Sequence, residues 1–189
     1  EVTLRIADVV VINKIDSADP ESINIVRESI EKVNPKAIVI DAASPIKVDD
    51  PSVIRGKNVL VVEDGPTLTH GEMKLGAGIV AARKFGAAAI IDPRPFVVGR
   101  LKETFRLYPG IGTLLPAMGY GEEQLRDLEK SINNTKCDSV IIATPIDLKR
   151  IINIKKPATR VYYDLQEIGD PTLLQVLDEF VSKKKIKTK

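Results

Sequence analysis

The residues with the most distinctive chemical pattern are Asn13, Lys14 and Asp16, which directly follow the apolar run Val9–Ile12. The spacing Asn-Lys-x-Asp matches a motif that reads guanine. The Asp16 carboxylate would accept hydrogen bonds from N1–H and the 2-amino group of the base, and Asn13 would reach its O6/N7 edge. The stem of Lys14 would lie along the base plane. A strand that ends in a polar turn gives the same four residues, but a preceding strand is the context that the motif requires.

A second loop of small residues follows the next apolar stretch, Ala37–Ile40. In P-loop GTPases, the strand after the Asn-Lys-x-Asp helix also ends in a Ser/Ala loop, whose backbone N–H contacts guanine O6. We therefore predict that Ala43 and Ser44 bind the nucleotide together with the first loop. Small residues in a tight turn are also expected without any ligand. Between the two loops, Asp19 as N-cap and Pro20 at the first helical position predict a helix.

Polar side chains also follow the later apolar runs. Two adjacent carboxylates, the only histidine, an arginine and several hydroxyl groups stand at the ends of predicted strands. Carboxylates suit a hard cation, arginine suits phosphate, and glycine and threonine suit backbone and hydroxyl contacts. We predict catalytic roles for Glu63, Asp64 and His70, a Mg²⁺ ligand at Asp64, and substrate contacts at Thr67, Thr69, Arg94, Tyr120 and Thr144.

Each of these residues has a plainer alternative. Glu63 and Asp64 could cap the following turn, and His70 could make a structural hydrogen bond. Arg94 could form an ion pair with Asp92. Tyr120 stands between two glycines, which suits a turn as well as stacking on a base.

The order of the apolar runs predicts the fold. Strand-like and helix-like segments alternate, which indicates an α/β fold with a mostly parallel sheet and helices on both faces, Rossmann-like or three-layered like a P-loop NTPase. If the strands are parallel, the polar loops emerge at one edge of the sheet. We place a domain boundary near Lys57, with residues 1–57 closing a P-loop NTPase domain and residues 58–189 forming a Rossmann-like module. The predicted strands are 9–12, 37–40, 58–62, 88–91, 112–115, 139–143 and 160–163, and the predicted helices are 20–33, 73–85, 96–107, 122–132, 148–152 and 172–183.

Composition narrows the class of protein. The 189 residues carry a net charge of only +2, so nothing global indicates nucleic acid as a partner. Cys137 is the only cysteine, which excludes a disulfide framework and a cysteine metal cluster. The apolar runs are too short to span a bilayer. These features predict a cytoplasmic protein with no membrane partner.

Five sequence blocks point to a family. The blocks ADVVVINKID, VLVVEDGPTLTHGEMKLGAG, IIDPRPFVVG, LLPAMGYGEEQLRDLE and ATPIDLKR resemble the carboxyl-terminal part of the cyclic 2,3-diphosphoglycerate synthetase-like family of predicted GTPases. The founding activity of that family closes 2,3-bisphosphoglycerate to its cyclic diphosphate with ATP and magnesium. The resemblance therefore implies GTP or ATP, Mg²⁺ and a phosphorylated small molecule as ligands, and a cyclising ligase or phosphotransferase as function.

One part of the family pattern is absent from the 189 residues. No G-x-x-x-x-G-K-[ST] sequence is present, so the phosphate cradle, its lysine and the magnesium-binding hydroxyl are missing. We therefore expect an upstream P-loop segment of the same protein as partner, and expect the chain alone to hydrolyse neither GTP nor ATP. A GTPase switch whose second module binds a partner, and a non-catalytic ligand-binding module, remain alternatives.

Overall fold

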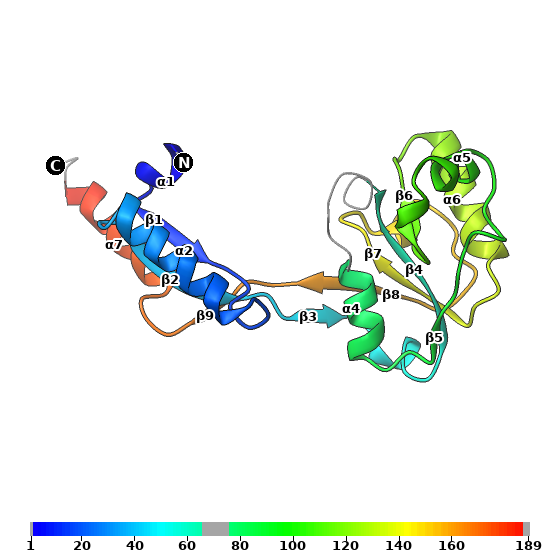
Figure 1. Cartoon of the computed structure of the whole chain (residues 1–189), viewed down its shortest axis with the longest axis horizontal. Coiled ribbons are helices and arrows are strands. Elements are labelled where there is room, and N and C mark those ends of the chain that lie inside the picture. Colours follow the sequence, from blue (N-terminus) through cyan, green and yellow to red (C-terminus); the bar gives the residue numbers. More distant parts are fainter. Residues whose placement is uncertain (1, 66–75, 187–189) are drawn as a thin grey trace. The chain divides into compact units, whose positions relative to one another are not determined.

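The computed structural model describes residues 2–65 and 76–186 and divides the chain into two compact units (Figure 1). Unit 1 comprises Glu1–Pro45 and Tyr163–Lys189, and unit 2 comprises Ile46–Tyr162. Unit 2 is thus one continuous stretch inserted into unit 1. None of the described helices is long and apolar enough to cross a membrane.

Unit 1 is built around a three-stranded sheet in the order β1-β2-β9. Strand β1 is parallel to β2, with Val9 opposite Ile38, whereas β9 is antiparallel to β2. The Asp19 carboxylate accepts a hydrogen bond from the backbone N–H of Ser22 (2.9 Å) and caps the first long helix, as predicted. The elements of unit 1 are α1 (Val2–Arg5), β1 (Val9–Ile12), α2 (Pro20–Val33), β2 (Ile38–Ala43), β9 (Gln166–Ile168) and α7 (Leu173–Ile186).

Unit 2 contains a second sheet, in the order β3-β8-β7-β4-β5, with β6 also paired to β4. Strand β4 is parallel to β5, β6 and β7, and β7 is parallel to β8. The strands of unit 2 are β3 (Ile46–Val48), β4 (Asn58–Asp64), β5 (Ala89–Ile90), β6 (Leu115–Ala117), β7 (Ser139–Ala143) and β8 (Ala158–Tyr163). Its helices are α4 (Ala77–Lys84), α5 (Arg100–Leu107) and α6 (Glu122–Asn134), with short 3₁₀ turns at η1 (Pro51–Val53), η2 (Pro109–Ile111) and η3 (Leu148–Arg150).

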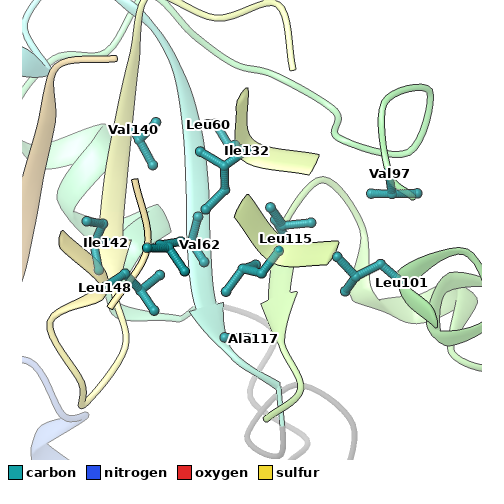
Figure 2. Close-up of a cluster of buried hydrophobic side chains, with 12 residues drawn as sticks. Leu60, Val62, Val97, Leu101, Leu115, Ala117, Ile132, Val140, Ile142 and Leu148 are labelled. Carbon is teal, nitrogen blue, oxygen red and sulfur yellow. The ribbon is translucent and has the colours of Figure 1, made fainter. Parts of the chain in front are cut away.

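Strand β4 contributes side chains to both faces of this sheet, because successive residues of a strand point to opposite sides. Leu60 and Val62 lie in one apolar cluster with residues of β6, β7, α5 and α6, whereas Val59 and Val61 lie in another with residues of α4 (Figure 2 shows the first cluster). Helices therefore cover both faces, as the sequence predicts. The first cluster comprises Leu60, Val62, Val97, Leu101, Leu115, Ala117, Leu128, Ile132, Val140, Ile142, Leu148 and Ile152.

The predicted α/β class is confirmed, but the sheet of unit 1 is mixed, because β9 runs antiparallel to β2. The sequence predicts one boundary near Lys57, with all of residues 58–189 in a second module. In the structure the chain passes between units at Pro45 and again at Tyr163. The reason is the pairing of β9 with β2, which returns the last part of the chain to unit 1.

Helix α4 lies very close to β4 at Gly78. A Cβ atom at Gly78 would collide with Cγ1 of Val61 and approach Oε1 of Glu63 to 2.9 Å. The glycine is therefore needed for the close contact between helix and strand, rather than for binding a ligand phosphate.

Replacing Gly78 with alanine should lower the free energy of unfolding by about 1–3 kcal/mol, because the added methyl group overpacks a buried strand. Gly110→Ala is the matched control, since no atom lies within 4 Å of its added Cβ. We expect the control to stay within about 0.5 kcal/mol of the parent chain in urea unfolding. Equal stability of both variants would contradict the close packing of α4 on β4.

Candidate functional site

The loop after β1 carries Asn13 at the carboxyl end of the strand, and its side chain organises the loop. The Asn13 Oδ1 atom accepts hydrogen bonds from the backbone N–H of Lys14 (2.7 Å) and from Oγ of Ser44 (2.9 Å). Ser44 directly follows β2, which lies parallel to β1. One amide side chain thus ties together the two loops that the sequence assigns to a nucleotide base.

Two further contacts fix the same pair of loops. The backbone N–H of Ser44 donates to Oδ1 of Asp16 (3.4 Å), and the N–H of Ile15 donates to the carbonyl of Ala42 (3.1 Å). Ala43 is buried at the end of β2 and lies opposite Gln166 of β9. The described contacts of Asn13 and Asp16 therefore come from their own loop pair, and both side chains are exposed to solvent.

Lys14 adopts a left-handed backbone conformation, with φ of +63°, which side-chain-bearing residues rarely take. Its carbonyl accepts hydrogen bonds from the N–H groups of Ser17 (3.1 Å) and Ala18 (2.9 Å). These contacts and the Asn13 bond hold a conformation that costs about 1–3 kcal/mol. Such strain in a well-bonded loop is typical of functional sites.

The loop pair presents one donor group and one acceptor group to solvent. The Asn13 Oδ1 atom is engaged within the loops, so in the described part of the chain its Nδ2 amide is left to donate outward. The Asp16 carboxylate retains acceptor capacity beyond its bond to Ser44. A donor beside a carboxylate is the complement of the O6/N7 and N1–H/2-amino edges of guanine.

In unit 2, three strand ends meet at one edge of the sheet. Asp64 of β4 lies opposite Ala117 of β6, and Glu63 lies opposite Ala143 of β7. The loops that carry Asp64, Tyr120 and Thr144 therefore leave the sheet side by side; we call this edge the β4 rim. Strand β5 pairs only with the start of β4, so the Arg94 loop leaves the sheet near Val59 and short of the rim.

Glu63 is buried, with 4% of its surface exposed, and points at the start of helix α4. Its Oε1 atom accepts hydrogen bonds from the backbone N–H groups of Gly78 (2.8 Å) and Ile79 (3.2 Å). Burial raises the pKa of Glu63, and these two backbone donors oppose the rise. The carboxylate fills the anion-binding position at the helix N-terminus with a group of the protein itself.

Arg94 and Thr144 both make local contacts. The Arg94 guanidinium donates to both carboxylate oxygens of Asp92, with Nε at 2.9 Å from each, and this pairing holds the pKa of Asp92 below its usual value. Thr144 is buried, and its hydroxyl donates to the carbonyl of Ile146 (2.7 Å). The first contact joins the two ends of a short turn, and the second shapes the loop after β7.

The rim between β4 and β6 is tightly packed. A Cβ atom at Gly65 would collide with Sδ of Met118 and approach the carbonyl of Ala117 to 2.9 Å. The Tyr120 hydroxyl is buried and has no hydrogen-bond partner within the described residues. Burial, and then the charge of Asp64, raise the pKa of Tyr120. The charge of Asp64 thus acts on Tyr120 at this rim.

Three predicted site residues, Thr67, Thr69 and His70, lie outside the described residues. Among the residues that are described, no three histidine, cysteine or acidic side chains gather as they would around a metal ion. The described part of the chain therefore shows no cluster of three such ligands around Asp64.

Two features of the loop pair are not among the predictions from the sequence. The Arg27 guanidinium donates to both oxygens of Asp41 (2.9 and 2.8 Å) and fixes α2 against β2. The sequence contains a signal for this ion pair, because Asp41 directly follows an apolar run and Arg27 lies in the helix before that run. The left-handed conformation of Lys14 has no sequence signal, because lysine does not favour it.

The chain matches no known protein-family model. It is similar to the arginine synthetase ArcE of Thermococcus kodakarensis (strain KOD1), with 61% identity over 180 residues. The matched stretch is 95% of this chain and 40% of the relative, so the chain spans about two fifths of the length of that protein. A synthetase as relative agrees with a nucleotide-dependent ligase in general, and its name gives no link to cyclic 2,3-diphosphoglycerate.

Glu63→Gln tests the buried carboxylate, because glutamine keeps an acceptor oxygen and removes the charge. A raised pKa in the folded state stabilises the fold below the ordinary glutamate pKa, and this contribution is lost as the pH rises through the raised value. As the pH rises above about 4, the unfolding free energy of the parent chain should therefore fall relative to that of Glu63→Gln. Urea unfolding at several pH values measures both.

Glu122→Gln is the control, because Glu122 is an exposed glutamate in the first turn of α6. This variant should follow the pH profile of the parent. A difference between parent and Glu63→Gln that stays constant with pH would contradict the effect of burial on Glu63.

Proposed function

We propose that this chain belongs to a nucleotide-dependent ligase, in which unit 1 reads the nucleotide base and unit 2 contributes to the substrate site. The observation that carries the proposal is the loop pair after β1 and β2, tied by the Asn13–Ser44 bond. It lies beyond the carboxyl ends of two parallel strands, where α/β folds bind ligands. The similarity to a synthetase supports the ligase class.

The residues of the loop pair fit GTP better than ATP. Asp16 accepts from N1–H and the 2-amino group of guanine, which adenine does not present in that pattern. Asn13 donates to O6 or N7, and the stem of Lys14 lies along the base. Ser44, which bonds to Asn13 and Asp16, and the preceding Ala43 complete the loop pair. The nucleotide, when bound with Mg²⁺, supplies the phosphoryl group that activates the substrate.

We infer arginine as the product, on the basis of the relative's name. An acidic residue, Asp64, lies in the described part of the β4 rim, and a carboxylate is a suitable acceptor for the guanidinium of arginine. Arg94, a predicted phosphate ligand, already pairs with Asp92 and leaves the sheet short of the rim. Asp64 and Tyr120 are the described residues that we assign to the substrate, with Thr144 shaping the loop beside them.

A second candidate is the cyclising ligase that acts on 2,3-bisphosphoglycerate. The sequence blocks that resemble that family favour it. The described contacts of Arg94 oppose it, since a guanidinium held at both carboxylate oxygens of Asp92 has less capacity for a phosphate.

A chimaera tests the two candidates. This chain would replace the matching stretch of the Thermococcus kodakarensis relative, and the product would be identified by mass spectrometry. With nucleotide, Mg²⁺, ammonia and candidate amino-acid precursors, we expect arginine to form, and we expect none from the chain alone because it lacks a phosphate cradle. Cyclic bisphosphoglycerate in place of arginine would support the second candidate. A folded chimaera that only hydrolyses nucleotide would contradict both and favour a switch.

Asp16→Asn in the chimaera should weaken GTP more than ATP. The exchange places an amide donor against the guanine donors, a loss of about 1–3 kcal/mol, or roughly 5- to 150-fold in affinity. Isothermal titration with both nucleotides measures it. Asp19→Asn is the control, because Asp19 only caps α2 and asparagine caps a helix equally well. Equal losses of GTP and ATP affinity would count against guanine reading by this loop.

A further inference from the structure

Strand β1 is an edge strand with an unusual composition for that position. In the described part of the chain it pairs only with β2, and its residues are Val-Val-Val-Ile. Three of its four residues are only half-buried. Continuous apolar runs are typical of parallel strands with a neighbour on each side, and an exposed apolar edge promotes association.

The hydrogen bonds to β2 show which backbone groups remain on the open edge. The N–H of Ile38 donates to the carbonyl of Asp8 (2.9 Å), so Asp8 faces β2. Backbone direction alternates along a strand, so Val10 and Ile12 also face β2. Val9 and Val11 therefore direct their N–H and C=O groups away from β2, toward the open edge.

Helix α2 extends apolar surface on the same side. Ile30 is the buried residue of this helix. Successive helical residues are about 100° apart around the axis, so Arg27 lies about 60° to one side of Ile30 and Val26 lies about 40° to the other side. Arg27 pairs with Asp41 of β2, so the Arg27 flank faces β2 and the Val26 flank faces the open side of β1. On that flank Val26 is 46% and Ile25 57% exposed.

We propose that the open edge of β1 and the Ile25–Val26 flank of α2 form a docking surface for one further parallel β-strand with its helix. The strand would bond to Val9 and Val11, and its helix would cover Ile25 and Val26. The occupant is the part of the protein that corresponds to the remaining three fifths of the relative's length, since this chain matches only 40% of it. This inference does not depend on which nucleotide or substrate is bound.

Amide hydrogen exchange tests the surface. The chain alone is compared with the chimaera in which it replaces the matching stretch of the Thermococcus kodakarensis relative. We expect the amides of Val9 and Val11 to exchange about 100-fold or more slowly in the chimaera, whereas the amide of Val10 is protected in both. Equal exchange at Val9 and Val11 in the two proteins would overturn the proposal. In the chain alone, amide protection that rises with protein concentration, together with the mass of a dimer in solution, would show that a second copy occupies the edge. That result would overturn the proposal that the rest of the protein occupies it.

Proline substitutions give a second readout that needs no ligand. Val11→Pro removes an N–H on the open edge, which an edge strand tolerates, so the chain alone should keep its circular dichroism and melting temperature. The matched Val10→Pro removes an N–H bonded to β2 and should melt earlier in the chain alone. In the chimaera, or when the rest of the relative is co-expressed as a separate polypeptide, Val11→Pro should also lower thermal stability or prevent association. Val11→Pro that disrupts the isolated chain as Val10→Pro does would overturn the proposal.

Discussion

Strand β4 is the element on which unit 2 depends, because it pairs in parallel with three other strands and is buried on both faces. Its residues 59–62 are fully buried. Successive side chains of this strand point to opposite faces of the sheet and enter different apolar clusters. The strand therefore packs against α4 on one face and against α5 and α6 on the other. Because β6 and β7 are aligned with the last residues of β4, the register of this strand also decides which loops share the rim. Packing and site geometry thus have one common origin.

The end of β4 shows how the same position can serve structure rather than ligand binding. In α/β folds a helix N-terminus beyond a strand is a natural anion site. Here Glu63 supplies the anion, and Gly76 and Gly78 are the residues that let the carboxylate approach, since a Cβ at either would meet it. The two glycines therefore allow the Glu63 carboxylate to reach the helix and allow α4 to pack closely on β4. The substrate contacts that we propose at this rim involve the next residue, Asp64, and the loop of Tyr120 beside it.

Much of this fold follows from sequence patterns that are local. Val9–Ile12 and the helix from Pro20 are found where the apolar run, the Asp19 cap and the proline predict them. Strand β9 was missed because three residues with a half-polar pattern carry no signal of their own, and only pairing with β2 defines them. The contact of Arg94 with Asp92 was foreseen as an alternative, whereas the burial of Glu63 was not. The burial of Glu63 depends on where α4 packs against the sheet, and the spacing of residues in the sequence does not predict that position.

The two halves of the proposed nucleotide loop are held by a small sheet that is open on one side. Val9 and Val11 face the open edge of β1, and Asn13 directly follows the last residue of this strand. A strand added there would therefore constrain the residue that begins the base-reading loop. Lys14 already adopts a strained conformation, so the loop gains most from a rigid strand before it. If the loop reads a base as we propose, completion of the sheet would also preorganise that loop.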